Sequence, residues 1–180
     1  MSVSANQFHY MTSVAIALTV FGLVAKWYLW PAVRSRPPAT ALAPLFLYAC
    51  LRVNGLMFLM PGLVSPQLPR TFSVPTAYGD LSAALLALVA LFCVRTGNAA
   101  AMPMTWLFNI VGLTDLIYAT YSSFRDQVDP TYLGTSYYLA SINVPAMTVV
   151  HIVIFAYLLR TWTREPAANA VATSGSRRPA

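Results

Sequence analysis

Five apolar segments take up most of this chain and constrain its fold more than any other feature. They cover 11–30, 40–60, 79–94, 102–121 and 137–159. A helix needs about 20 mainly apolar residues to cross the hydrocarbon of a bilayer. Because lipid offers the backbone no hydrogen bonds, segments of this length must satisfy their own backbone groups as helices. The sequence therefore predicts an all-α fold, an integral membrane bundle of five transmembrane helices.

The composition also favours a membrane protein. Hydrophobic residues make up 58% of the chain and charged residues only 9%, against about 25% charged residues in soluble domains. The net charge is +6, but the basic residues are scattered at segment ends and do not form the stripe that binds nucleic acid. We therefore expect membrane lipids as partners, and no nucleic acid.

The basic residues beside the segments set the orientation of the bundle. Eight of them fall on one side: Lys26, Arg34, Arg36, Arg95, Arg160, Arg164, Arg177 and Arg178. The other side has Arg70 and Arg125, offset by Asp126 and Asp129. Since cytoplasmic loops carry the excess of Lys and Arg, we predict an outer N-terminus and a cytoplasmic C-terminus.

The stretch PGLVSPQLPRTFSVPTAYGD, between the second and third segments, predicts a cap outside the membrane. Its prolines interrupt helices and central strands, and they stand at Pro61, Pro66, Pro69 and Pro75. Its larger apolar residues suggest that it packs onto the bundle: Leu63, Val64, Leu68 and Phe72. We expect a proline-rich extracellular cap, with a linker resting on the lipid surface as the alternative.

The last segment should be bent near its start and followed by a disordered tail. Pro145 removes one backbone donor and should bend the helix. The transmembrane domain should cover 1–166. The segment 167–180, AANAVATSGSRRPA, is small, polar and basic, which predicts a disordered cytoplasmic tail.

Several polar residues lie inside the apolar segments. With a rise of about 1.5 Å per residue, Arg52, Asn54, Asp115 and Asn143 all lie at one level, roughly 9 to 12 Å below the outer helix ends. Asp80, at the start of the third segment, lies a little higher. An isolated charge at this depth costs about 2.5 to 3.5 kcal/mol on insertion scales. We therefore predict that Arg52 pairs with Asp115, that Asp80 is the second choice, and that Asn54 and Asn143 complete the network.

Two neighbouring residues extend this cluster, and one of its members has an alternative role. Tyr48 lies one helical turn from Arg52 and could stack on its guanidinium. His151 could relay protons or ligate a metal, although a hydrogen-bonded core histidine is the plainer interpretation. Asp80 could instead cap the start of its helix.

The cluster has two interpretations. It could fix the register of neighbouring helices, or it could form a polar pocket, since intramembrane ionisable residues are candidates for function. Seven candidate ligand-binding residues follow from the second interpretation: Tyr48, Arg52, Asn54, Asp80, Asp115, Asn143 and His151.

The leading functional hypothesis is a protein that binds or transports a small amphipathic or lipid-like molecule in an outward-facing pocket. One alternative is an enzyme acting on a lipid or isoprenoid, with Asp115 or Asp80 as general acid or base. Another is an accessory subunit of a larger membrane complex. A pocket predicts an accessible cavity, an enzyme predicts a carboxylate without an ion-pair partner, and an accessory subunit predicts a filled bundle.

No motif names a reaction, a cofactor or a metal, since the chain lacks GxSxG, HExxH, Walker and GxGxxG patterns. Cys50 and Cys93 have no CxxC partner, so we expect neither a zinc site nor a disulfide framework.

The PGLVSP…YGDL stretch resembles small bacterial membrane proteins of unassigned role, which implies no activity. We expect a multi-pass protein of the bacterial inner (plasma) membrane. Five spans are few for a monomeric transporter, so a homo-oligomer or a larger complex is also expected.

Overall fold

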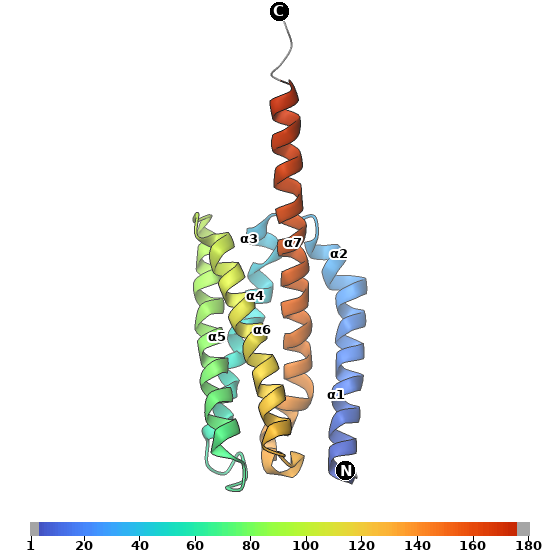
Figure 1. Cartoon of the computed structure of the whole chain (residues 1–180), viewed down its shortest axis with the longest axis vertical. Helices are drawn as coiled ribbons and strands as arrows, with labels where there is room; N and C mark the ends of the chain where they lie inside the picture. The colour runs from blue at the N-terminus through green and yellow to red at the C-terminus, as the bar shows by residue number, and fades with distance from the viewer. Residues whose placement is uncertain (1–3, 176–180) are drawn as a thin grey trace, which may run out of the picture.

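The protein is a bundle of long helices. A computed structural model describes residues 4–175, with side chains as far as Thr161. The elements run in the order α1 (Ala5–Val24), η1 (Ala25–Leu29), α2 (Trp30–Val33), α3 (Pro38–Ala41), α4 (Ala43–Ala49), η2 (Cys50–Leu59), α5 (Arg70–Thr96), α6 (Ala101–Arg125), η3 (Pro130–Ser136), η4 (Leu139–Asn143) and α7 (Val144–Gly175). The main helices lie along the long axis of the molecule (Figure 1). There is no strand among the described residues, so the all-helical prediction is confirmed.

Four helical stretches are long and apolar enough to cross a membrane. They are Ala5–Val33, Pro38–Leu59, Arg70–Thr96 and Leu139–Thr161. The fifth predicted span, 102–121, falls within α6, which has 25 residues but is not among these four. Polar residues such as Asn109 and Asp115 lower its hydropathy. The fold thus indicates a membrane protein, with four helices among the described residues that are long and apolar enough to span.

The third predicted helix begins nine residues earlier than expected, at Arg70 instead of 79. The prediction that the prolines exclude a helix up to Asp80 is wrong, because α5 runs through Pro75. Proline costs the helix one backbone hydrogen bond, but the first turns of α5 are packed. Phe72 is buried there, and its ring lies edge-on to Phe58, with 5.7 Å between centroids.

The segment outside the helices is therefore shorter than the predicted cap and covers only 60–69. It packs onto η3: the Ser65 amide donates to the Tyr132 carbonyl (2.9 Å), and the Thr135 amide donates to the Leu63 carbonyl (2.9 Å). Leu68 is buried in the same cluster as Phe58. This segment and η3 close one end of the bundle, which we call the capped end.

The opposite end of the bundle, which we call the basic end, carries more basic residues than the capped end, where Arg70 and Arg125 lie. Arg34 follows α2, Arg95 lies in the last turn of α5, and Arg160 lies on α7. α1 begins at the capped end, and α7 leaves the bundle at the opposite end (Figure 1). The predicted disordered tail, 167–180, lies beyond the described side chains and stays a prediction. The predicted bend at Pro145 coincides with a change from π to α hydrogen bonding at Val144.

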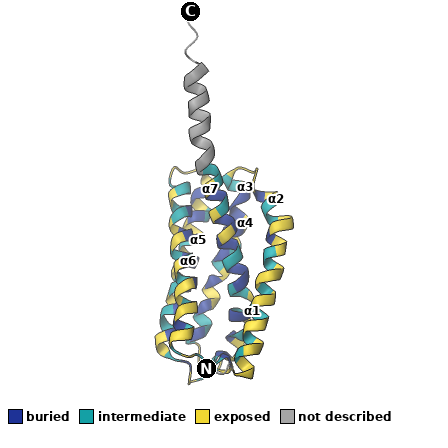
Figure 2. Ribbon diagram, turned by 45° about the vertical axis from the view of Figure 1, so that its right-hand side comes forward, coloured by how far each residue is buried: buried dark blue, intermediate teal, exposed yellow. Residues whose placement is uncertain are grey.

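Packing differs between the two halves of the bundle. The half next to the basic end, which we call the packed half, contains fully buried Phe46, Phe108, Ile154 and Leu158. The half next to the capped end, which we call the hollow half, has fewer buried residues. α1 has no buried residue and packs against α7 and η4, and it is exposed along most of its length (Figure 2).

Candidate functional site

The site begins with Arg52, which lies on an unusual helix. η2 (Cys50–Leu59) is a 3₁₀ helix of 10 residues, whereas most 3₁₀ runs stop after about four. Residues three apart share a face in a 3₁₀ helix, and the buried residues of η2 are Arg52, Gly55 and Phe58. η2 packs on α5, and a Cβ at Gly55 would overlap Asp80. The 3₁₀ form therefore turns Arg52 into the bundle.

Two carboxylates bind the Arg52 guanidinium. Nε donates to Asp80 Oδ1 at 2.9 Å, and Nη2 donates to Asp115 Oδ2. The predicted ion pair with Asp115 is therefore present, and the second choice, Asp80, pairs at the same time. Asp80 does not cap a helix, because α5 begins ten residues before it, at Arg70.

The remaining guanidinium contacts are on the side of α6 and α7. Nη1 of Arg52 donates to the Gly112 carbonyl (2.9 Å) and lies 3.1 Å from Nε2 of His151. A guanidinium only donates hydrogen bonds, so Nε2 accepts. Nδ1 of His151 lies 2.9 Å from Oδ1 of Asn109 and donates to it. His151 is therefore the neutral Nδ1–H tautomer, with both nitrogens engaged.

His151 is a core residue by its surroundings as well. It is fully buried, and its ring stacks on Phe108 with 4.8 Å between centroids and 24° between planes. This is the hydrogen-bonded core histidine of the plainer interpretation. A proton relay through it stays untested.

The residues joined by these contacts are Arg52, Asp80, Asp115, His151 and Asn109, which we call the Arg52 cluster. Two glycines bring this cluster against helix backbones. A Cβ at Gly79 would overlap the carboxylate of Asp115, and a Cβ at Gly112 would overlap the imidazole of His151. Only glycine lacks Cβ, so these positions fix how closely the charged side chains approach α5 and α6. The charged side chains are therefore packed directly between the helices.

The other three predicted residues do not join the cluster. Asn54 is exposed and makes no hydrogen bond with a described residue; it shares the depth of Arg52 but lies on another face of η2. Tyr48 does not stack on Arg52. Its hydroxyl donates to Asn143 Oδ1 at 2.9 Å, which forms a separate pair between α4 and η4. The predicted network with Asn54 and Asn143 is wrong because equal depth does not imply equal direction, and the predicted stacking of Tyr48 gives way to its bond with Asn143. A role of these residues in ligand binding stays a prediction.

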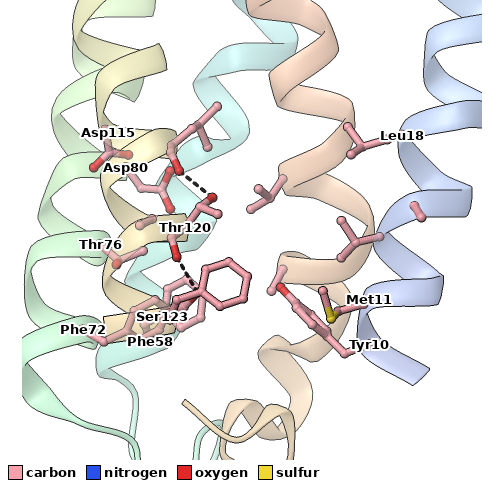
Figure 3. A pocket seen from close by; sticks show the side chains of 17 residues that line it. Tyr10, Met11, Leu18, Phe58, Phe72, Thr76, Asp80, Asp115, Thr120 and Ser123 are labelled. Atoms are coloured by element: carbon pink, nitrogen blue, oxygen red, sulfur yellow. Dashed lines mark hydrogen bonds between the residues drawn. The ribbon is translucent and has the colours of Figure 1, made fainter. Parts of the chain in front are cut away.

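A cavity of about 270 Å³ lies beside the cluster. α1 forms one wall and α5 with α6 forms the other (Figure 3). Its lining is mainly apolar and aromatic, including Leu18, Phe58 and Phe72, and Asp80 and Asp115 stand at its polar end. Both carboxylates keep 11% of their side chains accessible, against 1% for Arg52. The cavity therefore meets the carboxylates, with the guanidinium behind them.

The hydroxyls on the cavity wall differ in their partners. Thr120 donates to the Leu116 carbonyl (2.8 Å) and Ser123 to the Thr120 carbonyl (2.7 Å), both within α6 (Figure 3). Thr76 lies one turn from Asp80 on α5 and is 4% exposed, and its hydroxyl has no partner among the described residues. Thr76 is not among the predicted site residues, because it lies in the stretch predicted to form the cap.

The cavity continues towards the capped end. A second hollow of about 680 Å³ shares six lining residues with it: Tyr10, Met11, Phe72, Ser123, Phe124 and Ala140. Gln127, Asp129 and Leu133 line its far side. We call this hollow the vestibule. Together the two spaces lead from the capped end to Asp80 and Asp115.

Two aspartates at the capped end, Asp126 and Asp129, accept hydrogen bonds that stabilise their ionised forms. Hydrogen bonds from Arg125 and Thr71 lower the pKa of Asp126. Hydrogen bonds from Thr131 lower the pKa of Asp129. Both groups are therefore ionised at neutral pH at the capped end.

Long apolar helices with a polar-ended cavity among them define the class, a helical membrane protein. The chain belongs to a family described as a domain of unknown function (DUF8737), which covers residues 9–159. No curated protein and no solved structure matches the chain. The family range includes the whole Arg52 cluster and both cavity walls.

Proposed function

We propose that the protein binds a small amphipathic molecule in the cavity between α1 and the α5–α6 pair. One observation carries the proposal: an apolar space of about 270 Å³ ends at two carboxylates and opens into the vestibule. Ligand sites are mostly apolar clefts with a few convergent polar groups. The tail of the molecule would lie against Leu18 and Phe72, and its head would reach Asp80 and Asp115.

The proposal includes a topology of five spans. α6 has 25 residues, about 37 Å at about 1.5 Å each, which exceeds the roughly 30 Å of bilayer hydrocarbon. It packs against α5 and α7, and its most polar residues, Asn109 and Asp115, bind side chains of neighbouring helices. With the basic end in the cytoplasm, the capped end and the vestibule face outside, as expected for a bacterial inner-membrane protein.

The alternatives have less support. An enzyme would need a carboxylate free to exchange protons, but Asp80 and Asp115 both bind Arg52. An accessory subunit predicts a filled bundle, and the cavity argues against that. Binding is therefore the function that these contacts favour, with transport as an extension of the same site.

The test is saturable binding of radiolabelled 1-dodecanol, a neutral amphiphile, measured by scintillation proximity on the purified protein in nanodiscs. Ala119 lines the cavity, so Ala119→Trp should fill the space and remove the saturable component. The matched control is Ile117→Trp on the same helix, where the side chain is 62% exposed and does not line the cavity. Equal binding by both variants would show that the probe binds elsewhere.

A further inference from the structure

The charges that face the cavity and the vestibule are all negative. Among the residues that the structure describes, Asp80, Asp115 and Asp129 are the charged residues on the two linings. The chain as a whole has the opposite balance, with 11 Lys and Arg against 5 Asp and Glu. A path whose described walls carry carboxylates and no lysine or arginine is unfavourable for an anionic head group and favourable for a cation.

Arg52 does not reverse this balance. It is 2% exposed, is not part of the lining, and directs Nη1 away from the cavity to Gly112 and His151. His151 is neutral by its hydrogen bonds. Two carboxylates therefore face one guanidinium, and the cluster has either a surplus negative charge or one proton on a carboxyl group.

The carboxylates also have acceptor capacity to spare. A carboxylate offers about four acceptor sites, and Arg52 uses one on Asp80 and one on Asp115. A group that fills the remaining sites must donate hydrogen bonds. A carboxylate or phosphate head group would instead bring like charge against them.

A second polar group on the same wall lacks a partner. Thr76 is 4% exposed, and its hydroxyl makes no hydrogen bond with any described residue, although it lines the cavity next to Asp80. An unmade hydrogen bond of a buried hydroxyl is unfavourable, because the group has lost its water without gaining another partner. Rotation about χ1, which takes two positions for threonine in helices, exchanges its methyl and hydroxyl and would let it accept from a donor in the cavity.

The rest of the lining suits the tail of such a molecule and also its passage. Tyr10, Phe72 and Phe124 line both the cavity and the vestibule. Aromatic faces attract cations as well as apolar groups. From these features we infer that the ligand is a cationic amphiphile: an ammonium head group that donates to Asp80, Asp115 and Thr76, with an alkyl or aromatic tail in the cavity. This inference rests on the proposed function and names the class of molecule for the same site.

The experiment compares three radiolabelled probes of one chain length, dodecylamine, 1-dodecanol and dodecanoate, by scintillation proximity in phosphatidylcholine nanodiscs at neutral pH. A hydrogen bond that involves a charged group stabilises a complex more than a bond between neutral groups. We therefore expect dodecylamine to bind about tenfold or more tightly than either other probe. Asp115→Asn, which keeps an oxygen for Arg52, should weaken dodecylamine about tenfold and 1-dodecanol by less than about twofold. Thr76→Val, which leaves the Arg52 contacts intact, should weaken dodecylamine by about two- to tenfold.

The matched control is Asp126→Asn, a carboxylate outside both linings, which should leave all three affinities unchanged. Equal affinity for the three probes, each lost in Ala119→Trp, would overturn the cationic class and leave the proposed function standing. Saturable binding that Ala119→Trp does not remove, or none at all, would overturn the proposed function as well. Selective dodecylamine binding that is unaltered in both Asp115→Asn and Thr76→Val would place the selectivity elsewhere and overturn the inference.

Discussion

The packed half and the hollow half of the bundle are built from the same helices but are filled differently. In the packed half, α4, α6 and α7 bury Phe46, Phe108 and Ile154 completely. α1 runs along both halves and buries no residue (Figure 1), and in the hollow half a cavity separates it from α5 and α6. The Arg52 cluster lies between the two halves. The difference suggests that one half holds the helices together and the other leaves room for a ligand, so changes in each half should have different effects.

The largest effect is expected at the border between the halves. Arg52→Met leaves Asp80 and Asp115 without their counter-charge, and removal of one partner of a buried ion pair costs about 3 to 5 kcal/mol. The free energy of unfolding in mixed micelles with increasing SDS measures this loss. Adding Asp80→Asn and Asp115→Asn to the same protein should restore most of the stability, since no charge then stays unpaired. A single variant as stable as the wild type would mean that the pairs contribute nothing to packing.

The second prediction compares the same substitution in the two halves. Phe108 is fully buried between Phe46 and His151, whereas Phe124 is 66% exposed beside the cavity. Phe108→Ala should cost about 2 to 3 kcal/mol, below the 3 to 5 of a soluble core, because lipid removes most of the transfer term. Phe124→Ala should cost less than about 0.5 kcal/mol. The same SDS unfolding measurement applies, and equal losses would contradict the division into halves.

A third prediction concerns the close approach of charge and backbone. Gly79→Ala forces the carboxylate of Asp115 away from α5, and overpacking of this kind costs about 1 to 2 kcal/mol. Gly22→Ala is the matched control, because nothing lies within 4 Å of its added Cβ and alanine favours a helix interior by up to about 1 kcal/mol. We expect opposite signs for the two variants in thermal unfolding. A loss at both positions would point to a general effect of alanine and not to the cluster.

The smallest effect is expected for the ion pair outside the bundle. Hydrogen bonds from Arg125 and Thr71 lower the pKa of Asp126, so its carboxylate stabilises the folded state above the ordinary aspartate pKa of about 3.9. This contribution is lost as the pH falls through the lowered pKa. Asp126→Asn should therefore be slightly less stable than the wild type at neutral pH, and equal to it in strong acid. A difference that persists in strong acid would assign the effect to something other than ionisation.

Much of the helical architecture could be predicted from apolar length alone. Four of the five predicted segments correspond to helices that are apolar enough to span. The start of α5 could not be predicted, because a proline such as Pro75 ordinarily interrupts a helix. The burial of Phe72 and Thr76 against neighbouring elements outweighs the one lost hydrogen bond. Local sequence reports the cost of a proline but not the packing that offsets it.

The charged part of the candidate site could be predicted, because a charge inside an apolar segment needs an opposite charge beside it. Arg52 needs counter-charges within an apolar segment, and the contacts with Asp115 and Asp80 follow from that need. Asn54 has no such requirement, and its depth did not reveal the face on which it lies. A pocket was predicted, but its position between α1 and α6 and its lining could not be, because they depend on the distance between these helices, which the packing of α1 against α7 and η4 determines.

The accessibility of a cysteine on the cavity wall tests the central claim most directly. Ala119→Cys would be made in a protein whose own Cys50 and Cys93 are replaced by alanine, with Ile117→Cys as the lipid-facing control. The account predicts that membrane-impermeant methanethiosulfonates added at the capped end modify position 119, the positively charged reagent faster than its negatively charged counterpart. Position 117 should react with neither. Failure of both reagents to modify position 119, or a faster reaction of the negative reagent, would contradict an outward-facing cavity that attracts cations.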